Sequence, residues 1–231
     1  FVDHSVAAAI TMFLHKIKKP RPLTHDLIAN IFAMKMLGVQ WILSVSAVGS
    51  LKEKYEPLHM VIPDQFVDRT RQRIGTFFGH GLVAHVAFAH PFCPHVSTLL
   101  DEACAEAGAT HHVGGSYVCI EGPQFSSRAE SELYRSWGMD LVGMTNLQEA
   151  RLAREAEICY ATLALATDYD CWHEEEEDVS VSALLEILKA NSRLAAEVLR
   201  ALDRESSFAP RRGIRWSPAG LAARTGRRAT R

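Results

Sequence analysis

Trp41-Ile42-Leu43-Ser44-Val45-Ser46-Ala47-Val48-Gly49-Ser50 is the segment from which the architecture of this chain is most directly inferred. Its first six residues form a short, largely apolar run, which predicts a buried strand. The small residues from Ala47 to Ser50 are typical of a turn, so we expect the strand to end before them. A second apolar run, from Tyr160 to Ala166, predicts another buried strand, with Asp168 just past its end.

Helix and strand patterns alternate along the rest of the chain. Ser127-x-x-Glu130 is a capping box that predicts the start of a helix ending at Gly138. The alternation predicts an α/β fold in which a mixed central sheet is flanked by helices, built as a single domain by residues 1–205. The other helices are expected at residues 24–38, 97–107, 148–157 and 181–202, and the other strands at residues 7–14, 59–64, 116–120 and 141–144.

The bulk composition is that of a soluble globular protein. The chain has 231 residues, of which 48% are hydrophobic, and it can form one domain with a full core. No apolar run reaches the ~18 residues of a membrane span, so no membrane partner is expected. The start, Phe1-Val2-Asp3-His4, has neither a signal-peptide pattern nor a Met, so we expect a fragment or a late start.

The cysteine and histidine patterns predict reduced thiols and no metal centre. The five cysteines are scattered and form no Cys-x-x-Cys pair, which favours a cytoplasmic protein over a disulfide-bonded one. The eleven histidines are spread out, and His111-His112 has no matching ligand pair nearby, so zinc is not expected.

Charge is distributed unevenly between the body and the C-terminal segment. Residues 208–231 carry seven arginines and no acidic residue, although the whole chain has a net charge of -2. The composition of residues 206–231 predicts a basic, disordered tail. Nucleic-acid binding through this tail is an alternative, but no aromatic stacking series accompanies the arginines, which favours a solvated extension.

Two segments carry the residues of a candidate binding site. Residues 121–131 combine a turn, the aromatic side chain of Phe125 and a helix start, and Thr167-Asp168-Tyr169-Asp170 places two carboxylates at the end of an apolar run. An aromatic face and paired carboxylates suit a flat, nitrogen-rich base. Ligands of α/β sheets bind at the carboxyl ends of strands. We expect Ser46-Ala47, Met144-Thr145 and Asp168 to lie at those ends.

Several long motifs resemble the methylthioadenosine phosphorylases of the trimeric purine nucleoside phosphorylase family. The resemblance runs from about Ala29 to about Ala201. Its strongest stretches are Ser44 to Leu51, Pro63-Asp64-Gln65-Phe66-Val67-Asp68-Arg69-Thr70, Pro91-Phe92-Cys93-Pro94, Glu121 to Ser131, Met144-Thr145-Asn146 and Thr167 to Trp172.

The resemblance implies an activity. Members of this family cleave the N-glycosidic bond of 5'-methylthioadenosine with inorganic phosphate, giving adenine and 5-methylthioribose 1-phosphate. The reaction belongs to purine and methionine salvage and uses phosphate as co-substrate, without a cofactor.

The resemblance also implies roles for the base-binding residues. Asp168 is expected to share a proton with N7 of the departing adenine, and Asp170 to assist base binding. Phe125 is expected to lie against the base or the ribose. Relatives that prefer 6-oxopurines carry Asn and Glu at the positions of Asp168 and Ser126, so this pair favours adenine.

Further positions match the ribose, phosphate and methylthio contacts of the family. Met144 is expected beside the ribose, and Val181 and Leu184 beside the methylthio group. His85 matches a histidine that the family lends to a neighbouring subunit, which implies a homotrimer with shared sites. The phosphate oxygens are expected to bind the hydroxyls of Ser46 and Thr145 and the backbone N–H of Ala47.

The chain departs from the family pattern near its start. The family's N-terminal strand with its Gly-rich phosphate loop has no counterpart, because the first glycine is Gly38. Residues 14–23 stand where the family has an Arg-His-Gly loop. They lack that motif, but their three lysines, one histidine and one arginine keep positive charge there. Two alternatives therefore accompany the phosphorylase hypothesis: a silent or weak nucleoside-binding homologue, and a 6-oxopurine or methylthioinosine phosphorylase.

Overall fold

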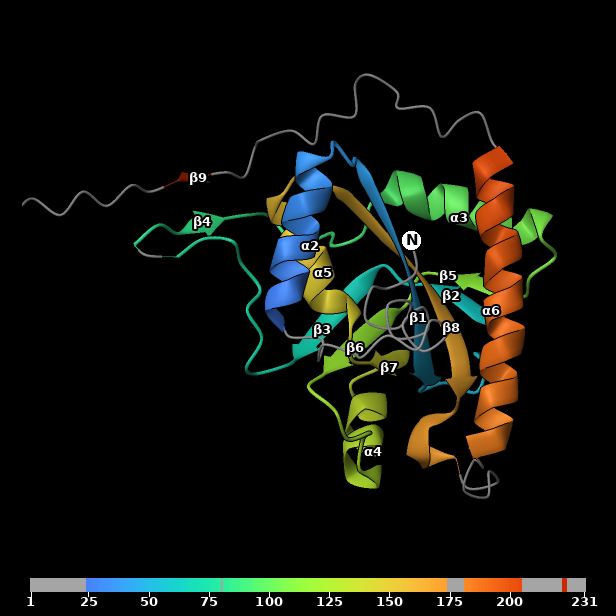
Figure 1. Ribbon diagram of the computed structural model, residues 1–231. Helices are drawn as coiled ribbons and strands as arrows, with labels where there is room; N and C mark the ends of the chain where they lie inside the picture. The colour runs from blue at the N-terminus through green and yellow to red at the C-terminus, as the bar shows by residue number, and fades with distance from the viewer. Residues whose placement is uncertain (1–23, 80, 174–180, 205–221, 224–231) are drawn as a thin grey trace, which may run out of the picture.

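A mixed seven-stranded sheet forms the centre of the molecule in the computed structural model (Figure 1). The structure describes residues 24–79, 81–173, 181–204 and 222–223. The strand order is β3-β6-β7-β1-β8-β2-β5, in which β1 runs parallel to β8 and antiparallel to β7. The predicted α/β fold with a mixed central sheet is confirmed.

The strands are β1 (Trp41–Ser50), β2 (Met60–Ile62), β3 (Gln65–Arg69), β4 (Ala84–His85), β5 (His111–Val113), β6 (Ser116–Ile120), β7 (Leu141–Gly143), β8 (Cys159–Asp168) and β9 (Ala222–Ala223). The helices are α2 (Thr24–Met36), α3 (Pro94–Glu106), α4 (Arg128–Ser136), α5 (Asn146–Glu155) and α6 (Val181–Arg204), and the 3₁₀ turn η1 covers Asp170–Trp172. No helix in the part of the chain that the structure describes is long and apolar enough to cross a membrane.

Helices cover both faces of the sheet (Figure 1). Alternate residues of the two central strands point to opposite faces. Val45, Leu163 and Leu165 pack with the apolar sides of α3 and α6, whereas Ile42 and Tyr160 pack with α2 and α5. The central strands are therefore buried on both sides along most of their length, and Ala47 is the exposed residue of β1.

The strand β1 corrects one prediction. The expected turn at residues 47–50 is wrong, because β1 continues through these residues to Ser50. Small residues are tolerated in this strand since it pairs with β8 along its whole length and with β7 at its end. The prediction that Ser46 lies at the carboxyl end of β1 is therefore wrong, because Ser46 is in the middle of the strand.

The remaining elements follow the predictions with small shifts. The capping box of Ser127 and Glu130 is present at the start of α4. Helix α5 begins two residues before its predicted start. The strands β3 and β5 were missed because they form the two edges of the sheet and are only partly buried, so neither is an apolar run, and the two-residue strand β4 was missed as well. The strand predicted at residues 7–14 and nearly all of the predicted tail lie outside the described residues.

Candidate active site

Asp168 owes its orientation to an irregularity between the two central strands. Val48 of β1 pairs with Ala166 of β8, but Gly49 pairs with Asp168, so Thr167 is an extra residue on β8. An inserted residue in a strand re-aims the side chains that follow it. Because of the insertion, the Asp168 side chain lies on the side of the sheet to which a Cβ of Gly49 would point.

The Asp168 carboxylate is held by its own segment and lies above Gly49. Its Oδ2 accepts a hydrogen bond of 2.6 Å from the Thr167 hydroxyl, and its Oδ1 accepts one of 2.8 Å from the Asp170 backbone N–H. A Cβ on Gly49 would lie 3.1 Å from Asp168 Oδ1 and 3.0 Å from a methyl group of Val142. The absence of a side chain at Gly49 therefore makes room for the carboxylate.

Asp170 turns its carboxylate toward the start of α4. Its backbone adopts a left-handed conformation (φ 53°), which is uncommon for a residue with a side chain. Burial raises the pKa of Asp170, and the neighbouring Asp168 adds to this effect, whereas the hydroxyls of Ser131 and Ser126 oppose it. Asp168 and Asp170 thus lie side by side in different environments, which suits them to different roles.

The turn η1 is anchored by Trp172. The indole Nε1–H donates a 2.8 Å hydrogen bond to the carbonyl oxygen of Ser50, and the guanidinium of Arg135 lies 3.3 Å from the ring centroid. Next to it, the Cys171 thiol donates to the carbonyl oxygen of Ser126 at 3.3 Å. The segment that carries both aspartates is therefore fixed to the end of β1 and to the loop before α4.

Ser46 and Thr145 form the second polar group of the site. Their hydroxyl oxygens lie 3.2 Å apart, and Ala47 beside them is exposed. Thr145 is the N-cap residue of α5, but its side chain makes no capping bond. The three residues predicted to bind phosphate thus gather at the N-terminus of a helix, where backbone N–H groups and the helix dipole favour anions.

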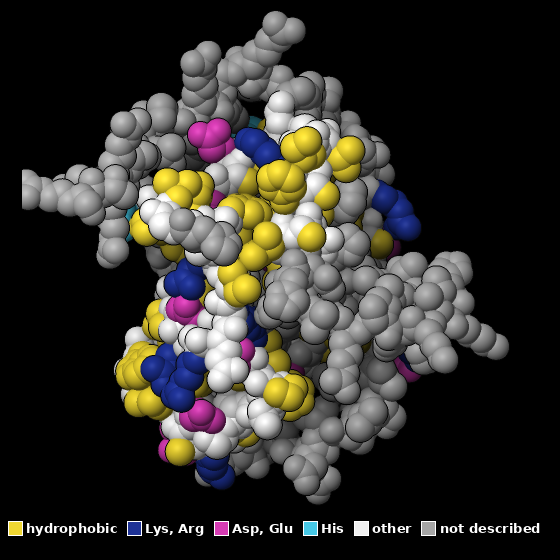
Figure 2. Space-filling model, turned by 60° about the vertical axis from the view of Figure 1, so that its left-hand side comes forward, with side chains coloured by type: hydrophobic (Ala, Val, Ile, Leu, Met, Phe, Trp, Pro, Cys, Tyr) yellow, Lys and Arg dark blue, Asp and Glu magenta, His cyan; other side chains and the backbone are white. Residues whose placement is uncertain are grey.

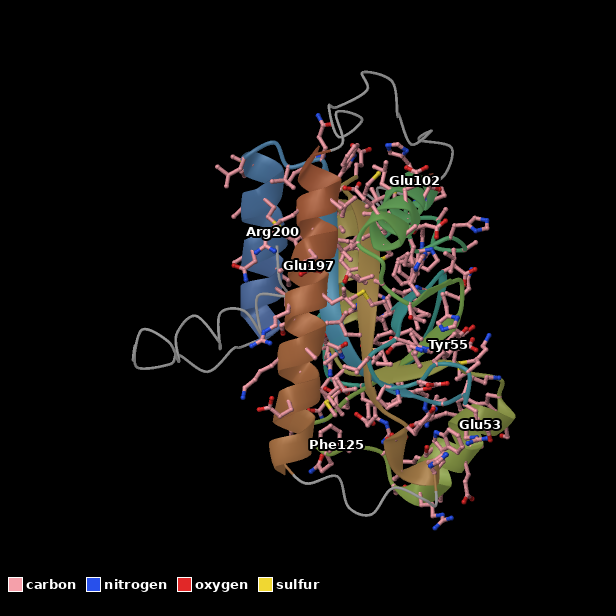
Figure 3. All side chains as sticks on the ribbon, turned by 90° about the vertical axis from the view of Figure 1, so that its right-hand side faces the viewer. Glu53, Tyr55, Glu102, Phe125, Glu197 and Arg200 are labelled. Atoms are coloured by element: carbon pink, nitrogen blue, oxygen red, sulfur yellow. The ribbon has the colours of Figure 1, made fainter. Side chains whose placement is uncertain are left out.

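Met144 packs beneath the turn that leads to Phe125. It contacts the cluster of Leu51 and Val142, and a Cβ on Gly122 would come within 2.6 Å of its sulfur. Gly122 has a positive φ of 67°, so this position requires glycine for two reasons. Phe125 itself is 81% exposed and lies at the lower end of the molecule in Figure 3.

Arg73 joins the segment before Phe125 to the start of α5, and sequence analysis missed it. Its Nη2 donates to the carbonyl oxygens of Ile120 (3.0 Å) and Glu121 (2.6 Å), and its Nη1 donates to the carbonyl oxygen of Met144 and to Gln148 Oε1 (3.0 Å). Its Nε donates to Glu121 Oε1 at 3.3 Å. All five N–H groups of the guanidinium are used, in a side chain that is only 12% exposed.

The other predicted residues are placed less directly. Val181 and Leu184 belong to the first turns of α6, which begins at the same end of the molecule as Phe125 (Figures 1 and 3). His85 is exposed on β4, which pairs with β9 apart from the central sheet. Within the described residues no group of three or more His, Cys, Asp or Glu side chains could hold a metal ion.

Comparison with known proteins adds to this geometry. The model of the phosphorylase superfamily matches residues 9–204. A methylthioadenosine phosphorylase from Schistosoma mansoni, solved in complex with adenine, is 36% identical with a TM-score of 0.73, and the match covers 76% of this chain and 68% of that one. The chain belongs to the phosphorylase superfamily, in its methylthioadenosine phosphorylase family.

Other members of this family are more similar in sequence. An S-methyl-5'-thioadenosine phosphorylase of Geobacter sulfurreducens is 59% identical over 182 residues, which are 77% of this chain and 64% of the relative. A methylthioadenosine phosphorylase from an antarctic soil metagenomic library is 53% identical with a TM-score of 0.74, covering 77% of this chain and 63% of that one. The chain spans less than two thirds of the length of these two phosphorylases.

A methyl group at Gly49 should displace the Asp168 carboxylate and affect activity more strongly than it affects the stability of the fold. Gly49→Ala places a Cβ against Asp168 Oδ1, and we expect any phosphorolytic turnover to fall by on the order of 100-fold, because small displacements of reacting groups have effects of this size. The free energy of unfolding, measured in urea, should fall by about 1–3 kcal/mol. Gly79→Ala, at a glycine with open space around it, is the control. Wild-type turnover in a folded Gly49→Ala protein would contradict this prediction.

The buried carboxyl of Asp170 should make stability depend on pH. Because its pKa in the folded protein is raised, its contribution favours folding below the pKa of an unfolded Asp and is lost as the pH rises through the folded value. Asp170→Asn should therefore gain stability relative to the wild type as the pH increases across this range. Urea unfolding at a series of pH values measures the difference, with the exposed Glu197→Gln as control (Figure 3). A pH-independent difference would exclude this account.

Proposed function

We propose that the chain catalyses the phosphorolysis of 5'-methylthioadenosine to adenine and 5-methylthioribose 1-phosphate. The observation that carries the proposal is the fixed carboxylate of Asp168 above Gly49, at the end of β8. As the glycosidic bond breaks, negative charge develops on adenine and positive charge on the sugar. In its protonated form the Asp168 carboxyl, positioned at N7, gives its proton to the base and stabilises its departure, which leaves the carboxylate.

The phosphate is proposed to bind at Ser46, Ala47 and Thr145. The two hydroxyls and the N-terminus of α5 provide hydrogen-bond donors for an anion, and inorganic phosphate then serves as second substrate with no cofactor. Both candidate subsites draw on the C-terminal half of β1, where Ala47, between Ser46 and Gly49, is exposed.

The nucleoside contacts are proposed to come from residues around this axis. Met144 would pack against the ribose, and Phe125 and Ser126 would contact the base together with Asp170. The first turns of α6, with Val181 and Leu184, would enclose the methylthio group. These assignments are supported by the loop positions that Arg73 holds and by the end of the molecule at which α6 begins (Figure 3).

We also propose a cytoplasmic homotrimer that acts in purine and methionine salvage. None of the five cysteines forms a disulfide, which supports the cytoplasm. Apolar side chains gather on the side that carries α2 (Figure 2), where Phe32, Met36 and Leu37 are exposed, and such a surface suits a protein interface. His85, exposed on β4, would reach a neighbouring site.

Sedimentation equilibrium should give three times the mass of the chain, and a monomeric mass under assay conditions would reject the trimer.

The activity is tested by phosphate-dependent release of adenine from methylthioadenosine. Release that requires phosphate supports the proposal. Folded protein that binds adenine in calorimetry but releases none with excess phosphate would instead be a silent homologue. Faster cleavage of methylthioinosine than of methylthioadenosine would indicate a 6-oxopurine enzyme.

Asp168→Asn should separate base recognition from folding. The amide cannot share a proton with adenine N7 as a carboxyl does, so kcat/KM for methylthioadenosine should fall by about 10²–10³-fold, with a relative shift toward methylthioinosine. Asp101→Asn on α3, where the aspartate pairs with His111, is the matched control and should keep full activity. An unchanged ratio of the two substrates would remove Asp168 from base recognition.

A further inference from the structure

A chain of hydrogen bonds leads from the proposed phosphate site into the core. The Thr145 hydroxyl donates to Oδ1 of Asn146 at 2.7 Å, and Nδ2 of Asn146 donates to the Thr162 hydroxyl at 2.8 Å. Asn146 and Thr162 are both 0% exposed, Ser46 is buried at 4%, and Thr145 is half-buried. Burying polar side chains destabilises the folded protein unless each of them is hydrogen-bonded. The retention of these buried side chains therefore points to a role beyond packing.

The direction of the protons in this chain bears on anion binding. The single proton of Thr145 is given to Asn146, so any hydrogen bond across its 3.2 Å contact with Ser46 is donated by Ser46, whose hydroxyl can also donate to the carbonyl oxygen of Ala47 at 3.4 Å. In either case both protons are given to acceptors of the protein, and the hydroxyls present lone pairs toward the place where phosphate would bind. A phosphate oxygen accepts hydrogen bonds, so this direction opposes anion binding.

Half a turn of the Asn146 amide reverses the chain without losing a hydrogen bond. Exchanging the oxygen and the nitrogen lets Nδ2 donate to Thr145 and lets Thr162 donate to Oδ1. The Thr145 proton is then free for the anion, and Ser46 no longer needs to donate to Thr145. The reversal depends on a side chain that carries a donor and an acceptor of nearly equal shape, which among the natural side chains means an amide.

We propose that Asn146 is a positioning residue of the phosphate site, which holds the Thr145 hydroxyl through its anchor on Thr162 and presents its proton to the anion. This inference rests on the proposed function, because it takes Thr145 as a phosphate ligand. Asn146 itself does not touch phosphate and acts only through Thr145. Its role is specific to the anion, and the nucleoside should be bound independently of it.

The test measures phosphate affinity and turnover separately in the full chain. Phosphate affinity is taken from the phosphate-dependent rise of the unfolding temperature, which needs no reaction. Asn146→Ala should weaken phosphate binding by on the order of tenfold, about the effect of one hydrogen bond to a charged group. The KM for phosphate should rise in parallel, while the KM for the nucleoside stays within about twofold of the wild type.

Variants of Thr162 test whether the effect passes through Asn146. Thr162→Val, which is nearly isosteric, should weaken phosphate binding, whereas Thr162→Ser keeps the hydroxyl and should restore it. The double variant with Asn146→Ala should bind phosphate no more weakly than Asn146→Ala alone, because both changes interrupt the same chain. Thr98→Val, which removes a hydroxyl that donates to the carbonyl oxygen of Pro94 within α3, is the control for the Thr162 variants.

The outcomes separate this inference from the proposed function. Additive losses, or phosphate binding within twofold of the wild type in folded Asn146→Ala or Thr162→Val, would overturn the role of Asn146. A wild-type chain that phosphate does not stabilise would overturn it as well. A chain that binds phosphate as described but releases no adenine would refute the proposed activity and leave this inference standing.

Discussion

The pairing of β1 with β8 is the constraint on which the site depends. Nine residue pairs join the two strands, with one extra residue, Thr167, on β8 just before the end. Were the strands in uniform register, Thr167 would face Gly49, and Asp168 would point to the opposite side of the sheet. The extra residue brings the carboxylate above the one position of the strand end that has no side chain, and the Thr167 hydroxyl then holds it there.

The loops around this point are stabilised by buried polar groups more than by regular structure. Arg73 binds three backbone carbonyl groups and two side chains, and so fixes the segment before Phe125 against the start of α5. The hydrogen bonds of Asn146 fix the start of α5 against β8. Both residues lie outside the proposed contacts with substrate, yet each determines where a contacting residue lies. Substitutions at such positions are expected to affect binding through geometry.

The sequence predicted the fold class and most of the elements because apolar periodicity determines them. It placed Asp168 at the end of a strand and brought Ser46 and Thr145 to one site, and these two hydroxyls are indeed neighbours. It failed at residues 47–50, where small residues signal a turn but pairing on both sides continues the strand. It could not single out Arg73 among the arginines at 69, 71 and 73, because local composition does not reveal which one is buried.

The central claim is that Asp168 meets the departing base. The most direct measurement is a crystal structure of the full chain with adenine and phosphate. The account predicts a carboxylate oxygen of Asp168 within about 2.6–3.2 Å of N7 of adenine. Adenine bound elsewhere, or an Asp168 side chain turned away from it, would contradict the account.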